Sequence, residues 1–340
     1  MKTKILEINP KKIDLAKIKI AAEEIKKGNL VAFPTETVYG LGADALNEKA
    51  VAKIFQAKER PFNDPLIAHI ANIKELYKLC KQVPTVALKL AKAFWPGPLT
   101  LVLKKSELVS GIVTAGLDTV AVRMPADNIA LSLIREAKTP IAAPSANLFG
   151  KTSPTTAQHV VDDLGGKIEM IIDGGKTKVG VESTVLDATV KPVRVLRAGG
   201  ISVEKLKEVI DQVKMSKELE EGFRSPGMLN RHYSPQAKLI LVEKKGDAQV
   251  EEIRRLASKY IAQGLKVGIM ATEENQNKYD RFEVRVIGKG TELEICAANL
   301  FAILRSFDKE GFEIIIAEGL EEHDLGLAIM ERLRKAAAPK

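Results

Sequence analysis

Short apolar runs alternate with segments of helical periodicity through the first two thirds of the chain. Apolar runs bounded by proline, glycine or polar residues predict buried strands, and apolar residues spaced three and four apart predict amphipathic helices. The predicted strands are 30–33, 66–70, 99–103, 119–124, a short one that begins at 140, 170–173 and 193–197. The predicted helices are 13–27, 47–58 capped by Asn47, 73–94 interrupted at Pro84, 129–137, 157–164 capped by Thr156, and 203–213.

A second pattern begins at Lys238, where the signals run strand, helix, strand, strand, helix, strand, helix. The segments are 239–242, 250–262, 267–270, 284–287, 293–306, 314–317 and 325–333. This alternation predicts a small parallel or mixed α/β sheet with helices on both faces. Because 340 residues exceed what one core usually supports, we predict a domain over 1–213, a linker over 214–237 and a domain over 238–340.

The stretch from Leu30 to Gly42 combines a buried strand with polar chemistry. Pro34 ends the strand because it has no N–H to donate. Two threonines, a glutamate and a tyrosine follow, and then a glycine-rich turn is predicted at Gly40 and Gly42. Such a strand end predicts the edge of a ligand site. The alternative is that these polar side chains only satisfy local backbone groups.

Charge is distributed unevenly along the chain. Residues 238–340 contain 17 Lys and Arg against 18 Asp and Glu, whereas residues 1–237 contain 35 against 26. An anionic ligand, phosphate or nucleic acid therefore belongs to the first two thirds, unless this is a basic domain without such a partner. Two cysteines far apart, histidines without metal-ligand spacing and no apolar run long enough for a membrane span predict a cytoplasmic protein with no metal site of its own.

Two glycine motifs suggest nucleotide loops but lack the necessary context. Gly40 to Ala45 matches G-x-G-x-x-A, yet Pro34 to Tyr39 separate the strand from these glycines. Gly174-Gly-Lys-Thr177 resembles the end of a phosphate-binding loop, but Met170 stands where its first glycine is needed.

Basic and polar residues elsewhere are better candidates for a site. Lys58 and Arg60, in a segment we predict to be extended, could reach one polyphosphate together, or could form a solvated helix end. Arg123 interrupts an apolar strand, so we expect an anionic partner, which is either a ligand or a structural acid. Ser145, Asn147 and Ser153 suit either a ligand or local turns, and His69 suits either a site or a satisfied core position.

With these features in place, the sequence resembles the threonylcarbamoyl-AMP synthases, the YrdC-type family in its long form with a C-terminal domain. The matching motifs run in order along the chain: 33–42 (FPTETVYGLG), Lys58-x-Arg60, 65–69 (PLIAH), 95–100 (WPGPLT), 122–125 (VRMP), 143–147 (APSAN), 173–175 (DGG), 182–185 (ESTV), 195–199 (VLRAG) and the linker segment 225–235. The resemblance implies an α/β fold: a twisted, mixed-sheet domain with a basic concave face, followed by a smaller Rossmann-like domain.

The resemblance also implies a reaction and its partners. L-threonine, bicarbonate and ATP, assisted by Mg²⁺, would give threonylcarbamoyl-AMP and pyrophosphate. The product would then pass, through a threonylcarbamoyl-transferring machinery, to an adenosine of tRNA. A direct contact of the basic face with tRNA or double-stranded RNA is part of this expectation.

Residue roles follow from the same resemblance, position by position. Threonine would be bound by Thr35, His69, Arg123, Ala143 and Ser183. ATP would be bound by Lys58, Arg60, Asp64, Thr119, Ser145, Asn147, Ser153, Arg197 and Tyr233, with Lys58 and Arg60 acting in catalysis through their charge. Asp64 stands where many relatives carry an uncharged polar residue, so its part in the nucleotide site, near Mg²⁺, stays open.

Two other classes remain open at this level. A domain of this fold could bind double-stranded RNA or tRNA through its basic face without catalysis. A related carbamoyl transferase would use carbamoyl phosphate, but such proteins are longer and carry additional zinc-binding cysteines, whereas this chain has two cysteines.

The linker is expected to act as a lid, because it carries an arginine, a histidine and Tyr233 between two prolines. We therefore predict that Tyr233→Ala, or a cut within 214–237, weakens turnover while the first domain stays folded. Turnover and circular dichroism of the variant check this, and unchanged turnover would contradict it. An ordinary surface linker is the alternative.

Overall fold

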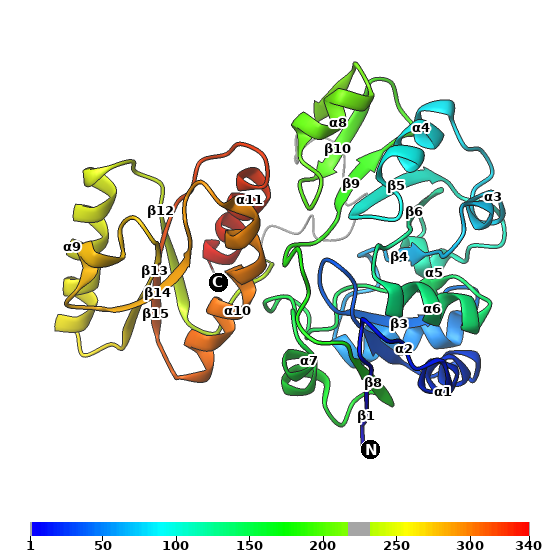
Figure 1. Cartoon of the computed structure of the whole chain (residues 1–340), viewed down its shortest axis with the longest axis horizontal. Coiled ribbons are helices and arrows are strands. Elements are labelled where there is room, and N and C mark those ends of the chain that lie inside the picture. The colour runs from blue at the N-terminus through cyan, green and yellow to red at the C-terminus, as the bar shows by residue number, and fades with distance from the viewer. Residues whose placement is uncertain (1, 217–231, 340) are drawn as a thin grey trace. The chain divides into compact units, whose positions relative to one another are not determined.

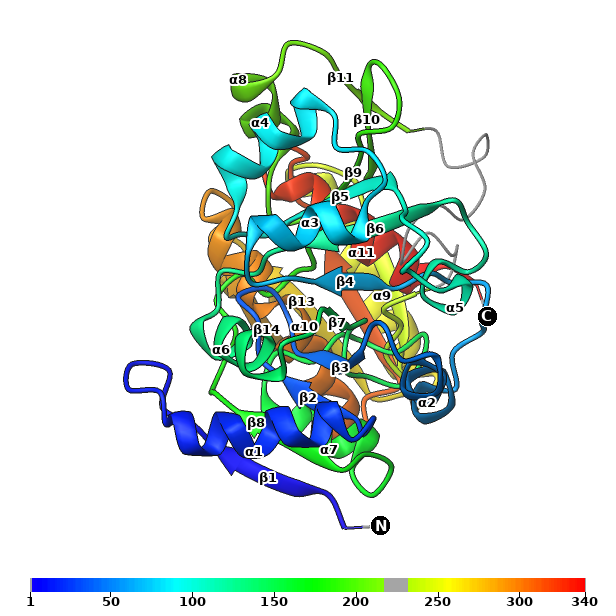
Figure 2. The same ribbon diagram turned by 90° about the vertical axis from the view of Figure 1, so that its right-hand side faces the viewer.

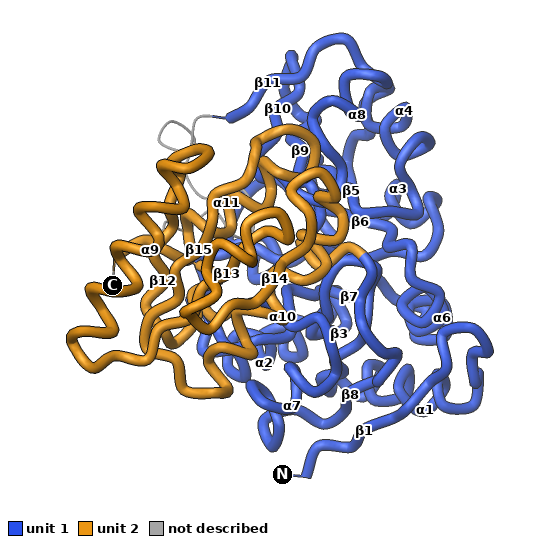
Figure 3. Tube along the Cα trace, turned by 60° about the vertical axis from the view of Figure 1, so that its left-hand side comes forward, with its two compact units in different colours: residues 1–149, 153–178, 182–228 blue, residues 150–152, 179–181, 229–340 orange. Residues whose placement is uncertain are grey.

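The chain forms two compact units in the computed structural model, which describes residues 2–216 and 232–339 (Figures 1 and 3). Unit 1 comprises residues 1–149, 153–178 and 182–228, and unit 2 comprises 150–152, 179–181 and 229–340. Residues 217–231 of the predicted linker lie outside the described residues. Within the described parts, no helix is both long and apolar enough to span a bilayer.

Unit 1 is built on one mixed sheet in the order β1-β8-β2-β3-β7-β4-β6-β5-β9-β10-β11. Its strands are β1 Lys4–Glu7, β2 Val31–Phe33, β3 Gly40–Asp44, β4 Ile67–His69, β5 Leu99–Lys104, β6 Thr119–Arg123, β7 Ile141–Ala142, β8 Met170–Asp173, β9 Thr184–Asp187, β10 Val193–Arg197 and β11 Val213–Met215. Its helices are α1 Leu15–Lys26, α2 Glu48–Lys58, α3 Leu76–Leu79, α4 Thr85–Phe94, α5 Gly111–Thr114, α6 Asn128–Ala137, α7 Ala157–Leu164 and α8 Val203–Val209, with a 3-10 turn η1 at Ile73–Glu75.

Helices cover both faces of this sheet. On one face, α1 and α6 pack together over Val31, Phe33 and Ile141 (Figures 1 and 2). The larger core lies on the opposite face, where α2, α4 and α7 cover apolar residues such as Leu101 and Val122. The predicted caps are confirmed, because the side chains of Asn47 and Thr156 accept hydrogen bonds from the first turns of α2 and α7.

Some element predictions are wrong for identifiable reasons. Gly40 and Gly42 lie in strand β3, paired antiparallel with β2, and the turn is at 34–39 instead. A Cβ on Gly42 would lie 2.7 Å from the Phe33 ring, so glycine is required there by close packing. The helix predicted to reach Val213 ends at Val209, and Val213 begins β11, which pairs with β10. β1 and β9 were not predicted.

Unit 2 is a four-stranded, all-parallel sheet in the order β12-β15-β13-β14. Its strands are β12 Lys238–Val242, β13 Val267–Thr272, β14 Glu283–Gly288 and β15 Ile314–Glu318. Its helices are α9 Asp247–Ala262, α10 Leu293–Lys309 and α11 Gly326–Ala337, with a 3-10 turn η2 at Gln276–Tyr279. Figure 1 shows α9 on one side of the sheet and α10 and α11 on the other, so the predicted α/β arrangement with helices on both faces is confirmed.

Gly199, just after β10, provides a test of unit 1. A Cβ at this position would lie 2.3 Å from the carbonyl carbon of Ser183 and 2.4 Å from the backbone nitrogen of Thr184. We predict that Gly199→Ala destabilises the protein by about 2–3 kcal/mol, because rigid backbone atoms cannot move aside. Gly111→Ala is the control, since its Cβ would meet nothing within 4 Å, and it should stay within about 0.5 kcal/mol of the wild type. Thermal denaturation measures both, and equal stability of the two variants would contradict the prediction.

Candidate active site

One face of the unit 1 sheet carries a small apolar floor with a charged residue, Arg123, at one end. The floor consists of Ile67, Val102, Ala121, Val185 and Leu196. In β6, Thr119 and Arg123 share the face of Ala121, because side chains alternate along a strand. Thr119 begins the strand and Arg123 ends it, which separates their Cα atoms by about 13 Å. Arg197 is level with Arg123 across the sheet, because Val185 pairs with both Arg197 and Thr100, and Thr100 pairs with Arg123. The predicted site residues form two groups, one around Arg123 and one around Asp64.

The end of β6 brings together Arg123, His69 and Glu36. β4 and β6 are parallel, and their register sets His69 beside Arg123. The Arg123 Nη2 atom lies 2.7 Å from Glu36 Oε1, and both side chains are buried. The expected anionic partner of Arg123 within the chain is thus a glutamate that was not among the predicted site residues.

His69 is a neutral group in this environment. Complete burial, together with the nearby Arg123 guanidinium, lowers the pKa of His69 to about 3. One ring nitrogen, Nδ1, lies 3.2 Å from the carbonyl oxygen of Ile67. The imidazole can therefore offer a hydrogen bond at neutral pH but no positive charge.

Thr35 lies on the loop that carries Glu36, and Ala143 lies beside Ile67, at the start of β4. The Thr35 hydroxyl donates to the carbonyl of Val38 at 2.7 Å and accepts from the backbone nitrogens of Thr37 and Val38. Thr35 therefore satisfies backbone groups of its own loop, which is the alternative that the sequence left open for this stretch. The backbone nitrogen of Ala143 donates to Ile67, which holds the start of the 143–147 loop against β4.

Ser183 and Arg197 connect the two groups of predicted residues. Arg197 Nη2 donates to the Ser183 carbonyl oxygen at 2.8 Å and lies 3.2 Å from its hydroxyl. That hydroxyl is also 2.7 Å from the Thr100 hydroxyl, on the neighbouring strand β5. A residue expected for threonine and one expected for ATP are thus in direct contact.

Lys58 and Arg60 are both buried, but they are not on an extended segment as predicted. Lys58 is the last residue of α2, and Glu59 reverses the chain with a φ of 56°. Lys58 Nζ donates to the carbonyls of Ser145 and Asn147 at 2.6 and 2.5 Å. Arg60 Nη2 lies 2.8 Å from Asp64 Oδ2 and 3.0 Å from the carbonyl of Pro65. The helix ends at Lys58 as predicted, and the left-handed Glu59 prevents an extended segment from Lys58 to Arg60.

Asp64 is positioned as the partner of Arg60. Burial raises the pKa of its carboxyl group, and the charges of Arg60, Lys58 and Arg197 oppose that effect. These interactions also place the three cations near one carboxylate. No group of three His, Cys, Asp or Glu side chains within 2–216 and 232–339 could hold a metal ion. Because Asp64 is buried and paired with Arg60, it does not fit the role of a Mg²⁺ ligand.

The remaining predicted nucleotide residues lie close to these cations in the fold. Asn147 is buried and its side-chain nitrogen donates to Leu148 at 2.8 Å. The Ser153 hydroxyl forms a short hydrogen bond with Glu182. Thr119 lies next to the start of β4, because Ala121 is in register with Ile67. The backbone of Ser145 forms an isolated antiparallel β-bridge with Gly40 of β3.

Tyr233 belongs to unit 2, and it is buried there. Its ring stacks on Phe301 with centroids 5.6 Å apart, and the Arg332 guanidinium lies 5.3 Å from the ring centre. His232 contacts the same ring edge-on at 4.1 Å. Tyr233 is thus anchored in the C-terminal domain, directly after the residues that the structure leaves undescribed.

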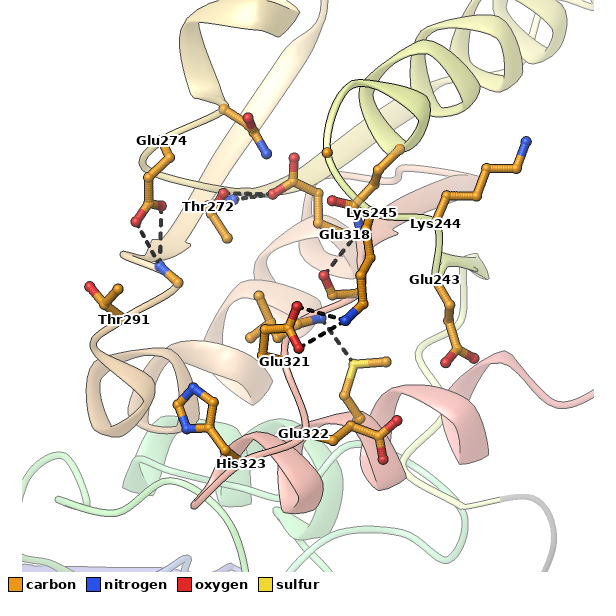
Figure 4. Close-up of a pocket in the computed structure, with 17 residues that line it drawn as sticks. Glu243, Lys244, Lys245, Thr272, Glu274, Thr291, Glu318, Glu321, Glu322 and His323 are labelled. Carbon is orange, nitrogen blue, oxygen red and sulfur yellow. Dashed lines mark hydrogen bonds and ion pairs between the residues drawn. The ribbon is translucent and has the colours of Figure 1, made fainter.

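Unit 2 also has a pocket of about 440 Å³ at the carboxyl ends of its parallel strands. Charged residues line it, but they are largely paired with one another (Figure 4): Lys245 with Glu321, and buried Glu318 with Thr272. The backbone nitrogen of Gly290 donates to Glu274. None of the predicted site residues lines this pocket.

Three residues of the site were missed as site residues: Glu36, Glu182 and Thr100. Glu36 had a signal, because it directly follows Thr35 and because a buried Arg123 needs an acid. Glu182 and Thr100 had no sequence signal beyond the motifs that contain them. Glu182 contacts Ser153 and Thr100 contacts Ser183, and both contacts join segments far apart in sequence.

Comparison with known proteins gives a consistent result. The family model Sua5_yciO_yrdC, described as telomere recombination, matches residues 23–199, and the model of the threonylcarbamoyl-AMP synthase C-terminal domain matches residues 201–338. A threonylcarbamoyl-AMP synthase of Pyrococcus abyssi is 52% identical over 331 residues, 96% of this chain and 95% of that protein. One of Bacillus subtilis is 48% identical over 321 residues, 93% of this chain and 92% of that protein.

A solved structure agrees with these matches. The crystal structure of P. abyssi Sua5 complexed with L-threonine has a TM-score of 0.93 and 51% sequence identity to this chain, and the match covers 98% of each chain. The two family models follow one another along the chain with a single residue between them. The chain therefore belongs to the threonylcarbamoyl-AMP synthase family of nucleotidyltransferases, in its long form, with a YrdC-type domain followed by the Sua5 C-terminal domain.

Proposed function

We propose that this protein converts L-threonine, bicarbonate and ATP into threonylcarbamoyl-AMP and pyrophosphate, for the formation of N6-threonylcarbamoyladenosine in tRNA. The observation that carries the proposal is the arrangement of the buried charges. A buried arginine at the end of β6 suits an amino-acid carboxylate, and three further buried cations around Asp64 suit a nucleotide. A small apolar floor lies on the sheet face that carries Arg123.

Threonine binds at the Arg123 end. The Arg123 guanidinium accommodates the carboxylate of the amino acid, because its planar fork matches carboxylate geometry. We assign neutral His69 and Thr35 to contacts with the threonine side chain. The backbone of Ala143 and the Ser183 hydroxyl complete this set.

ATP binds at the three cations around Asp64. Lys58, Arg60 and Arg197 balance the phosphate charge, with Asp64 holding Arg60 in place. Thr119, Ser145, Asn147 and Ser153 supply polar contacts to the nucleotide. Tyr233 stays in the proposed nucleotide set because of its motif, although its ring stacks on Phe301 of unit 2. Mg²⁺ arrives on the phosphates of ATP instead of at a site made by the protein.

The reaction brings together two anions, the carbamate made from threonine and the triphosphate of ATP. The neutral threonine amine first forms a bond to the carbon of bicarbonate, a C–O bond breaks and water leaves, which gives the carbamate. A carbamate oxygen then forms a bond to the α-phosphorus, and the bond to the departing pyrophosphate breaks. Lys58, Arg60 and Arg197 offset the repulsion between carbamate and triphosphate and stabilise charge on the leaving group. Positioning of both reactants on one rigid sheet contributes the larger part. We assign no general base.

The remaining elements of the proposal concern the surroundings of the enzyme. The protein acts in the cytoplasm, supplies its product to a threonylcarbamoyl-transferring machinery, and can contact tRNA through its basic face. Residues 214–237 act as a lid between a catalytic domain, 1–213, and a C-terminal domain, 238–340.

The activity is tested by measuring pyrophosphate release from ATP. We expect release only when L-threonine and bicarbonate are both present, because the nucleophile is made from them. Release that does not require threonine would contradict the proposal. A protein that binds RNA yet releases no pyrophosphate would be the non-catalytic RNA-binding module, and release that needs carbamoyl phosphate would indicate the carbamoyl transferase.

The division of the site is tested with two conservative variants. Loss of a charge-assisted hydrogen bond costs about 1.5–3 kcal/mol, or roughly 10- to 100-fold. We therefore expect Arg123→Lys to raise the KM for threonine by about that factor, and Arg60→Lys to raise the KM for ATP. Exposed Arg135, on the outer side of α6, provides the control Arg135→Lys, which should change neither. If each variant affected the other substrate, the division would be wrong.

A further inference from the structure

The Glu36–Arg123 pair is buried without satisfying its hydrogen bonds. Glu36 is 7% exposed and Arg123 is 4% exposed. Although Arg123 Nη2 and Glu36 Oε1 are 2.7 Å apart, their alignment does not make a hydrogen bond. Among the described residues, both carboxylate oxygens of Glu36 and the Nη2 atom of Arg123 therefore have no hydrogen-bond partner.

Neighbouring groups do not supply the missing donors. The Thr35 hydroxyl already donates to the Val38 carbonyl. His69 Nδ1 faces the Ile67 carbonyl. The Asp127 carboxyl group caps α6, because its Oδ1 atom accepts from the backbone nitrogens of Ile129 and Ala130. A buried carboxylate without donors is costly, so a ligand that brings donors is the simplest explanation.

The pair places one positive and one negative side chain next to each other, and this defines the chemistry of the ligand. An α-amino acid has a carboxylate and an ammonium group on one carbon atom, and so it presents both charges within a few ångströms. The carboxylate can accept hydrogen bonds from Arg123, and the ammonium can donate to Glu36. Each unsatisfied atom of the pair then has a complementary partner.

We propose that Glu36 is a specificity-determining residue that binds the α-ammonium group of the amino-acid substrate, while Arg123 binds its carboxylate. This inference rests on the proposed function, because it assumes that threonine occupies this end of the face. It adds the recognition of the amino group. A ligand with a hydroxyl group in place of the ammonium would leave the Glu36 charge without a cation and would bind more weakly.

Glu36 could instead act only by holding Arg123 in place. A residue with that structural role would affect every ligand that uses Arg123, whether or not the ligand carries an ammonium group. The two roles are therefore distinguished by comparing L-threonine with its 2-hydroxy analogue, 2,3-dihydroxybutanoate of the same stereochemistry.

The experiment is calorimetric titration of the full-length protein with each ligand. We expect the wild type to prefer L-threonine by about tenfold or more, the value of a hydrogen bond to a charged group. In Glu36→Gln that preference should fall to near one, because affinity for threonine drops while affinity for the analogue is retained. Equal weakening of both ligands, or an unchanged preference, would overturn the proposal.

Two further measurements keep the result interpretable. Glu318→Gln is the matched control, since Glu318 is also a buried carboxylate, but its donors are Thr272 and Tyr279 in unit 2. It should leave the preference for threonine unchanged. If Glu36→Gln does not fold, as judged by thermal denaturation, the wild type alone decides, because equal binding of both ligands overturns the proposal and a clear preference for threonine supports it.

Failure of this inference is distinguishable from failure of the proposed function. A wild type that releases pyrophosphate only with threonine, yet does not distinguish threonine from the analogue, retains the proposed function and loses the role of Glu36. A wild type that does not bind threonine loses both.

Discussion

Burial of positive charge is the constraint on which the rest of unit 1 depends. Lys58, Arg60, Arg123 and Arg197 are all at least nine-tenths buried, and each is held by a different kind of group. Asp64 pairs with Arg60, Glu36 with Arg123, the Ser183 carbonyl with Arg197, and two loop carbonyls with Lys58. Desolvated cations of this kind interact strongly with anions, which a phosphate- and carboxylate-binding site requires.

Close backbone packing holds the loops that surround these cations. Gly42 lets β3 lie against Phe33, and Gly199 lets the end of β10 lie against the segment that carries Ser183. Tyr39 connects a further loop, because its hydroxyl donates to the Gly175 carbonyl at 2.8 Å and accepts from the Gly174 nitrogen. Gly42, Gly199 and Tyr39 do not contact the buried cations themselves, but they fix the positions of the segments around those cations.

Local signals in the sequence predicted most of the elements. Periodicity and caps located α2, α6 and α7 closely, and the alternating pattern after Lys238 predicted the parallel sheet of unit 2. The failures share a cause. Gly40 and Gly42 suggested a turn by local preference, but strand pairing with β2 overrides it. Val213 continued an apolar pattern, and only its pairing with β10 makes it a strand.

The sequence by itself determined which residue types are available and the family to which they belong. It showed that Arg123 needs an anion, because the flanking residues are apolar. Only the tertiary structure decided which anion, since Glu36 and Arg123 are 87 positions apart in the printed sequence and meet through the loop after β2 and the end of β6. Contacts between distant segments depend on register and packing, and no local pattern encodes them. The contact between Arg197 and Ser183 likewise depends on register and packing. So does the absence of hydrogen bonds in the Glu36–Arg123 pair.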